Sequence, residues 1–289
     1  MTDGLERAVV VTGASTGIGR AAVASAVKGG SHVFAGVRKQ ADAKSLTAEF
    51  GKTVTPLIFD VTDKAAVASA AAKVGKALGK RKLFGLVNNA GMAVAGPLLH
   101  LTTEDLRRQM EVNFIGAHIV TQAFLPLLGA DTERTGPAGR IVMISSVGGE
   151  AAFPFLGAYS ASKYAMEGYS EALRRELMLF GVDVVIIAPG AIATPIWDKS
   201  DDGSIEAYRE TRYGPILERV RDFMLTNGAK GLPPSRVGDL IWRALSKPKP
   251  KTRYRILRGE FVQITLPKFL PKRTVDGAIA KLLGLQPAR

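Results

Sequence analysis

Short runs of apolar, β-branched residues alternate along this chain with longer segments whose apolar residues recur at helical spacing. The short runs predict strands over Ala8–Thr12, His32–Val37, Val54–Val61, Leu83–Asn88, Arg140–Ser145, Val182–Ala188 and Thr252–Leu257. The longer segments predict helices over Gly19–Lys28, Ala65–Leu78, Thr103–Leu128, Tyr159–Phe180 and Arg236–Leu245. Apolar strands that alternate with helices indicate a parallel sheet covered on both faces. We therefore predict an α/β fold with a doubly wound sheet of about seven strands, which binds its ligand at the carboxyl ends of the strands.

Two stretches interrupt this alternation. The segment Gly129–Gly139 is a polar loop, whereas Ile192–Pro234 is long, mixed and aromatic and directly follows a predicted strand. A long insertion at the ligand-binding edge of a sheet is more often functional than random. No repeat or linker divides the sequence, so we predict one domain over residues 1–289, with a substrate lid over 192–234 and a basic C-terminal extension over 258–289.

Composition narrows the chemistry and the partners. The chain has no cysteine, and its three histidines do not cluster, so we predict no metal site. Of its net charge of +13, most lies in residues 229–289, where 14 Lys/Arg stand against 3 Asp/Glu. A solvated surface, an anionic membrane, an acidic partner and nucleic acid are alternative reasons for such a charge. We rank nucleic acid last and predict no such partner, because no nucleic-acid-binding motif is present.

The sequence shows neither a membrane anchor nor a targeting segment. No uninterrupted apolar run reaches the roughly 18 residues that a membrane span needs. The first residues, Met1–Arg7, are polar and lead directly into a predicted strand. We therefore expect a cytoplasmic protein.

The first predicted strand leads into a glycine-rich turn, Thr12-Gly-Ala-Ser-Thr-Gly-Ile-Gly19. Glycines in such a turn let the backbone approach a pyrophosphate, and the N-terminus of the next helix favours the negative charge. The motif alone is a weak signal, but its place between an apolar strand and a helix makes it moderately specific. It predicts a dinucleotide site.

The G-x-x-x-G-x-G spacing of this turn resembles that of the short-chain dehydrogenase/reductase family. The other motifs of that family are present in its order, as Asn-Asn-Ala-Gly at Asn88–Gly91, an asparagine at Asn113, a serine at Ser146, Tyr-x-x-x-Lys at Tyr159–Lys163, and Pro-Gly at Pro189 and Gly190 followed by Thr194. Each motif falls at the edge of a predicted element, and the resemblance covers nearly the whole chain, less securely after Leu257. It implies an oxidoreductase that moves a hydride between a nicotinamide cofactor and a carbonyl or alcohol.

The resemblance assigns catalytic roles to four residues, Asn113, Ser146, Tyr159 and Lys163. Tyr159 and Lys163 lie one helical turn apart, so we expect the lysine ammonium to lower the pKa of the phenol and make it a general acid or base. Ser146 would hydrogen-bond the substrate oxygen. By resemblance, Lys163 also binds the nicotinamide ribose, and Asn113 shapes the helix and a water path. Ser145 faces the opposite way on its strand and is expected to be structural.

The second predicted strand ends in Arg38-Lys39, where NAD-dependent enzymes usually have a carboxylate. Arginine suits the 2′-phosphate of NADP, so we predict NADP(H) in preference to NAD(H). Ser15 would add a hydroxyl, and Asp60-Val61 resembles the family's adenine contact. The whole predicted cofactor site comprises Gly13, Ser15, Thr16, Gly17, Ile18, Gly19, Arg38, Asp60, Val61, Asn89, Ala90, Gly91, Tyr159, Lys163, Pro189, Gly190, Ile192 and Thr194.

The predicted lid is rich in apolar and aromatic residues. These are Ile192, Pro195, Ile196, Trp197, Tyr208, Tyr213, Ile216, Leu217, Phe223 and Met224. Such a lid favours a hydrophobic substrate, and the chain most resembles retinol and 17β-hydroxysteroid dehydrogenases, which implies a steroid-like or retinoid-like alcohol or ketone. A β-ketoacyl thioester reductase is the alternative, and a catalytically silent NADP(H)-binding scaffold is an alternative of another class.

Two further expectations concern partners. By resemblance, the chain forms a homodimer or homotetramer through the two long predicted helices, Thr103–Leu128 and Tyr159–Phe180. The basic extension mixes bulky apolar residues with cations over Phe261–Arg273, and a helix is expected over Thr274–Leu285. We favour the explanation that these apolar residues cover the domain's own core or a subunit contact. The alternative is that they dock the protein on a membrane.

Overall fold

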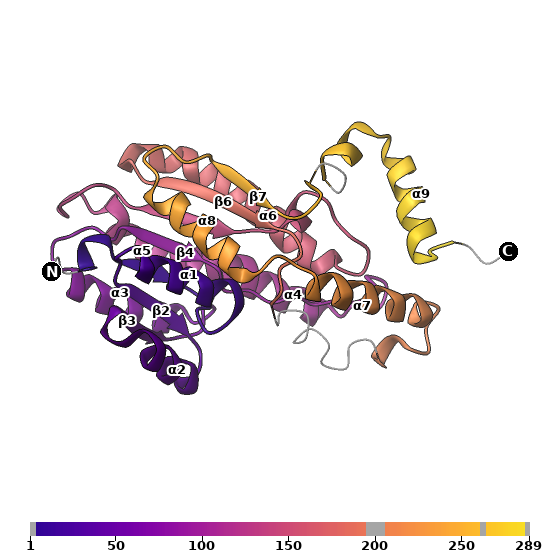
Figure 1. The fold of residues 1–289 in the computed structure, drawn as a ribbon, viewed down its shortest axis with the longest axis horizontal. Coiled ribbons are helices and arrows are strands. Elements are labelled where there is room, and N and C mark those ends of the chain that lie inside the picture. Colours follow the sequence, from indigo (N-terminus) through magenta and orange to yellow (C-terminus); the bar gives the residue numbers. More distant parts are fainter. Residues whose placement is uncertain (1–3, 195–205, 261–263, 287–289) are drawn as a thin grey trace.

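The computed structural model describes residues 4–194, 206–260 and 264–286, and in them seven parallel strands form one sheet in the order β3-β2-β1-β4-β5-β6-β7 (Figure 1). The strands are β1 Val9–Val11, β2 Val33–Val37, β3 Val54–Ile58, β4 Gly85–Asn88, β5 Arg140–Ile144, β6 Asp183–Pro189 and β7 Arg253–Ile256. The strand order reverses between β1 and β4, which is where a doubly wound sheet opens a crevice for its ligand. The predicted fold class and all seven predicted strands are confirmed.

Helices cover both faces of the sheet. They are α1 Gly17–Lys28, α2 Gln40–Phe50, α3 Lys64–Leu78, α4 Thr103–Met110, α5 Gly116–Leu125, α6 Gly157–Glu176, α7 Gly214–Ala229, α8 Pro234–Ser246 and α9 Lys272–Leu283. Alternate residues of a strand point to opposite faces, so Val9 and Val11 of β1 pack under α1, α2 and α8, whereas Val10 packs under α3, α5 and α6. The sheet therefore carries one apolar core on each face.

Three helices differ from the predictions. One is α7, which lies in the segment Ile192–Pro234, where no helix was predicted. The helix α2 was not predicted, because only Ala43 and Leu46 of its residues are buried and most of the segment is polar. The predicted helix over Thr103–Leu128 is present, but a π-helical turn over Glu111–Ile115 separates α4 from α5. Single π turns are rare and often mark functional sites, and this one contains Asn113.

The same helical stretch, Thr103–Ala130, is long and apolar enough to pass a membrane-span test by length and composition. Half of its most apolar window is buried inside the molecule. Val120 and Phe124 are fully buried among the core residues under α3 and α6. The apolar character of the stretch is thus accounted for by packing against the sheet.

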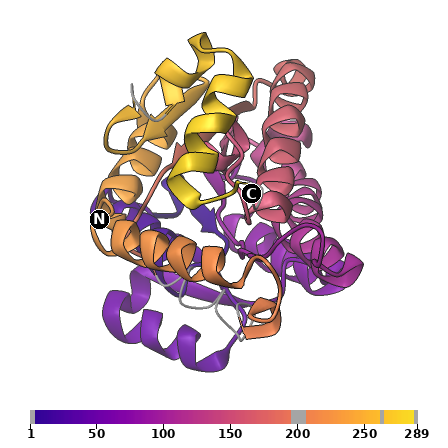
Figure 2. The same ribbon diagram turned by 90° about the vertical axis from the view of Figure 1, so that its right-hand side faces the viewer.

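The helices α7 and α9 lie together at one end of the molecule, beyond the carboxyl ends of the strands (Figures 1 and 2). Leu217 and Val220 of α7 pack with Leu283 of α9 and with Phe155, which precedes α6. The helix predicted over Thr274–Leu285 is thus α9. The predicted lid residues Pro195, Ile196 and Trp197 lie outside the described residues, as do the side chains of Phe223 and Met224.

Candidate active site

The turn after β1 holds glycines where side chains do not fit. Gly13 and Gly17 have φ values of 63° and 54°, in the left-handed region that favours glycine. A Cβ on Gly19 would lie 2.1 Å from the carbonyl oxygen of Gly13. Thr16, the N-cap of α1, makes no side-chain capping bond, and the first turn of α1 has no acidic residue. The helix N-terminus is thus suited to an anionic group such as a pyrophosphate.

Hydrogen bonds tie this turn to the segment that follows β4. Thr12 Oγ1 accepts hydrogen bonds from the backbone N–H groups of Asn89 and Ala90, each at 3.0 Å. Asn89 Nδ2 donates to the carbonyl oxygens of Thr12 and Gly13, at 3.0 and 3.1 Å. Asn89 and Ala90, both assigned to the cofactor site, therefore fix the glycine turn beside the end of β4.

Arg38, directly after β2, presents its guanidinium to solvent. Its side chain is 73% exposed, and Arg38 Nη1 lies 3.9 Å from Asp60 Oδ2. Asp60 Oδ1 accepts hydrogen bonds from the N–H and hydroxyl of Thr62, at 3.0 and 2.8 Å. Asp60 therefore organises the turn after β3, and Arg38 stays accessible to an anionic ligand.

The other residues assigned to the cofactor site lie along the same edge of the sheet or in the core behind it. Val61 and Ile192 are 8% and 4% exposed, so their side chains serve packing and leave mainly backbone groups for a ligand. The backbone N–H of Thr194 donates to the carbonyl of Ile192, at 2.8 Å. Ile18 packs against the core, the Ser15 carbonyl accepts from Arg20, and a Cβ on Gly190 would lie 2.6 Å from Leu257 Cβ.

Tyr159 lies in the first turn of α6, beside the loop that follows β5. The tyrosine is 9% exposed, and its hydroxyl shares a hydrogen bond with Ser146. Ser146 Oγ also accepts from the Gly148 N–H at 3.0 Å and lies 3.4 Å from the Pro189 carbonyl oxygen, to which it donates. Burial raises the pKa of Tyr159 above its usual value, and the hydrogen bond with Ser146 acts in the opposite direction.

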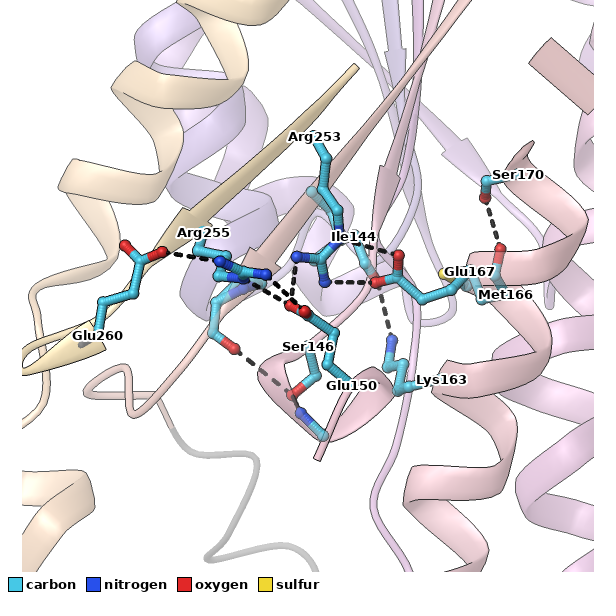
Figure 3. Close-up of polar contacts among 12 residues, drawn as sticks. Ile144, Ser146, Glu150, Lys163, Met166, Glu167, Ser170, Arg253, Arg255 and Glu260 are labelled. Carbon is cyan, nitrogen blue, oxygen red and sulfur yellow. Dashed lines mark hydrogen bonds and ion pairs between the residues drawn. The ribbon is translucent and has the colours of Figure 1, made fainter. Parts of the chain in front are cut away.

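Lys163 lies one helical turn after Tyr159 and is 5% exposed. Its Nζ donates to the Ile144 carbonyl oxygen at 2.8 Å (Figure 3). The same atom lies 5.7 Å from the centroid of the Tyr159 ring. Burial lowers the pKa of Lys163 to about 8, against the raising effect of the Glu167 carboxylate. The pKa of Tyr159 is thus raised overall and not lowered as expected, because desolvation of the phenol is the largest of the causes.

Asn113 lies inside the π-helical turn and is fully buried. Its Oδ1 accepts from the Met92 N–H at 2.8 Å, and its Nδ2 donates to the Met92 carbonyl at 2.9 Å and to Ser162 Oγ at 3.1 Å. Gln109, also fully buried, holds the same segment through Met92 and Val94. Asn113 thus acts on backbone and on α6, as a positioning residue.

The sequence prediction missed Gln109. The available signal was its spacing, since Gln109 precedes Asn113 by four residues and so shares its face of the helix. Ser145, predicted to be structural, is 3% exposed, and its Oγ makes no hydrogen bond with the described residues. Its neighbour Ser146, not Ser145, is the serine that meets Tyr159.

The loop between Ser146 and Tyr159 contains a strained residue, Phe155. Its φ of 67° is in the left-handed region, which a bulky residue rarely adopts. The carbonyl of Phe155 accepts from the Gly96 N–H at 2.8 Å, and its ring meets the Tyr213 ring edge-on, with centroids 5.8 Å apart. This strain is held by packing against α7 and the segment before it, which place apolar and aromatic side chains next to the Ser146–Tyr159 loop.

An ion-pair cluster that was not predicted is centred on Glu150, in the loop that follows Ser146 (Figure 3). Glu150 binds Arg255 through two hydrogen bonds of 2.7 Å, pairs with Arg253, and accepts from Lys268 Nζ at 2.6 Å. Arg253 also binds Glu167, whose carboxylate charge acts to raise the pKa of Lys163. The cluster ties β7 and the C-terminal extension to the loop that follows Ser146.

The arrangement offers a buried phenol, a hydroxyl and an ammonium beside a glycine turn suited to a dinucleotide. Such a set can move a proton to or from a substrate oxygen and hold that oxygen while charge develops. Within residues 4–194, 206–260 and 264–286, no group of His, Asp or Glu is arranged to bind a metal ion.

Comparisons with known proteins point to the same chemistry. A family model described as short chain dehydrogenase matches residues 7–204. An NADPH-dependent 3-dehydrocapnine reductase of Ornithobacterium rhinotracheale is 41% identical over 270 residues, which cover 93% of this chain and 95% of that protein. A 3-ketodihydrosphingosine reductase of Bacteroides thetaiotaomicron is 31% identical over 274 residues, covering 94% and 96%. The crystal structure of a short-chain dehydrogenase from Streptomyces avermitilis superposes with a TM-score of 0.74 at 29% identity, covering 95% of each chain.

Proposed function

The chain belongs to the short chain dehydrogenase family and is an oxidoreductase that uses a nicotinamide cofactor, and on this premise we propose that it is an NADP(H)-dependent reductase of a lipophilic ketone. The observation that carries the proposal is the hydrogen bond between the buried Tyr159 hydroxyl and Ser146, with Lys163 one turn further along α6. This group follows the carboxyl end of β5, at the same edge of the sheet as the glycine turn after β1.

In the proposed reaction, the glycine turn and Arg38 would hold NADPH, which when bound would supply a hydride to the carbonyl carbon of the substrate. Tyr159 donates its phenolic proton to the carbonyl oxygen, and Ser146 Oγ holds that oxygen as negative charge develops on it. Lys163, with a pKa of about 8, remains mostly protonated at neutral pH and stabilises the phenolate that forms. In the reverse direction, the same groups accept the proton of an alcohol.

The exposed Arg38 supports NADP(H) as the cofactor, because a guanidinium can bind the 2′-phosphate through paired hydrogen bonds. The name of the NADPH-dependent 3-dehydrocapnine reductase supports the same cofactor. The apolar cluster around Phe155 and Leu217 supports a lipophilic substrate, since it faces the loop that carries Ser146 and Tyr159. The name of the 3-ketodihydrosphingosine reductase puts 3-keto compounds first among the candidates.

A turnover screen tests the function. We expect NADPH oxidation with 3-ketodihydrosphingosine, or with a steroid ketone or retinaldehyde, and slower oxidation with acetoacetyl-CoA, which represents the thioester alternative. Each compound is assayed with NADPH and with NADH by absorbance at the nicotinamide band, against a no-substrate control. NADPH binding without turnover of any compound would favour the silent scaffold, and turnover of the thioester alone would favour the alternative enzyme.

Substituting Arg38 with Asp should reverse the cofactor preference. Losing a charge-assisted hydrogen bond costs about 1.5–3 kcal/mol, so kcat/KM with NADPH should fall by roughly 10- to 100-fold. Activity with NADH should rise, because the new carboxylate can bind a ribose 2′-hydroxyl. The control is Lys44→Asp, which makes the same charge change at an exposed position of α2. An unchanged NADPH/NADH ratio in Arg38→Asp would remove Arg38 from the cofactor site.

A further inference from the structure

The C-terminal extension presents apolar side chains to solvent at one place. We call residues 266–273 the tip; they include the short 3-10 helix η10, Leu266–Phe269, and the start of α9. Leu266, Phe269 and Leu270 of the tip are 39%, 81% and 41% exposed. Ile264 and Leu283 cover the domain's own core, since they are 4% and 3% exposed, whereas these three do not and are left for a subunit contact or a membrane.

The tip is held in a defined position. Lys268 Nζ donates to Glu150 at 2.6 Å, which fixes the tip to the loop after Ser146. Behind the tip, Leu283 of α9 packs on α7 and Phe155. Pro267 and Pro271 fix their own φ angles and so stiffen the backbone on either side of Phe269. The exposed apolar residues are therefore carried outward on an anchored element, at the same end of the molecule as the lid (Figure 2).

The charge of this region complements an anionic surface. Residues 264–286 contain four Lys/Arg and one Asp, a net charge of +3. Lys268 is neutralised by Glu150, whereas Lys272 and Arg273 are exposed next to Phe269 and Leu270. Bulky apolar side chains flanked by cations suit the boundary between the hydrocarbon and the anionic headgroups of a bilayer.

We propose that the tip docks on an anionic lipid bilayer, with Leu266, Phe269 and Leu270 entering the interface and Lys272 and Arg273 lying against the headgroups. Docking there places the lid end of the molecule at the membrane. The inference does not depend on which ketone is reduced, because binding to vesicles is measured without cofactor or turnover.

Vesicle flotation of the full chain tests the proposal. We expect binding to vesicles that contain phosphatidylserine, weaker binding to pure phosphatidylcholine, and release at about 1 M salt, where the Debye length is near 3 Å. Lys272→Gln with Arg273→Gln should lower the partition coefficient by roughly 10- to 30-fold, as two cations near an anionic surface predict. Phe269→Ser with Leu270→Ser should lower it by roughly tenfold or more, because both side chains lose their contact with the interface.

The matched control is Leu179→Ser. Leu179 is also 81% exposed, but it lies shortly before β6, at the amino-terminal ends of the strands. The tip follows β7, at the carboxyl ends of the strands. This variant should bind vesicles like the wild type, and circular dichroism confirms that every variant is folded. The proposal is overturned if the wild type does not float with phosphatidylserine vesicles, or if the tip variants bind as well as Leu179→Ser. It is also overturned if the tip substitutions abolish self-association in light scattering but leave vesicle binding intact, since the tip would then contact a second copy.

Discussion

Replacing Tyr159 with Phe should lower kcat by roughly 10²- to 10⁴-fold, the usual contribution of a general acid or base. The substitution removes only the hydroxyl that shares a hydrogen bond with Ser146. The ring keeps its packing against Ala93 and Leu156, so the fold and the cofactor site should be retained. We therefore expect the dissociation constant of NADPH to change by less than about threefold while turnover is lost.

The measurement pairs steady-state kinetics with an NADPH titration followed by fluorescence. Tyr164→Phe is the matched control, because Tyr164 lies in the same helix, is 46% exposed and undergoes the same chemical change. It should keep turnover within about twofold of the wild type, as most surface substitutions do. If Tyr159→Phe keeps more than about a tenth of the wild-type rate, the phenol is not the proton donor and the proposed mechanism fails.

The pKa values of the site explain why its pieces could be found in the sequence but its electrostatics could not. Tyr159 and Lys163 share a helix face, which follows from their spacing alone. Tyr159 packs against Ala93, which follows β4, and Lys163 contacts Ile144 at the end of β5, so their burial depends on segments that are distant in sequence. Burial raises the pKa of Tyr159 and lowers that of Lys163, and the spacing of the two residues in the sequence does not reveal this burial.

Parts of the fold that depend on local sequence pattern were predicted, whereas parts that depend on distant contacts were not. The central strands were found because each is a short apolar run that is buried on both sides, as Val9–Val11 shows. The helix α2 was missed because it buries little. The π turn was missed because it is associated with hydrogen bonds that Asn113 donates to Met92 and Ser162, which periodicity does not reveal.

The ion pairs of Glu150 are the contacts that were hardest to predict from the sequence. Arg253 and Arg255 stand two apart on β7 and therefore share one face, which the sequence does indicate. Their partner Glu150 lies on a loop more than a hundred residues earlier, and only the pairing of β6 with β7 brings them together. The basic C-terminal region thus has a structural role for part of its charge, while Lys272 and Arg273 remain exposed.

Substituting Glu150 with Gln should destabilise the protein by about 2 kcal/mol near neutral pH, because solvent screens part of the interaction of this partly buried carboxylate. Burial alone would raise the pKa of Glu150, but hydrogen bonds from Arg255 and Lys268 and the charge of Arg253 lower it from 4.5 to about 2. A carboxyl group whose pKa is lower in the folded state stabilises the fold above its unfolded pKa. This stabilisation should therefore be complete above pH 4.5 and be lost as the pH falls towards 2.

The amide of Gln cannot neutralise the three cations, so they remain partly desolvated without their charge partner. We expect the melting temperature to fall by roughly 4–8 °C, measured by circular dichroism at neutral pH, where the carboxylate is fully ionised. Acid unfolding of the variant should also depend less steeply on pH between 4.5 and 2 than that of the wild type.

Glu260→Gln provides the matched control for Glu150→Gln. Glu260 contacts only Arg255 within the described ion pairs, and its side chain is 45% exposed, compared with 13% for Glu150. Exposed pairs contribute about 0–1 kcal/mol, so this variant should melt within about 2 °C of the wild type. Equal melting temperatures for the two variants would mean that the cluster adds no more than a surface ion pair. The attachment of β7 and the C-terminal extension to the loop after Ser146 would then rest on apolar packing, through Phe155 and Leu283.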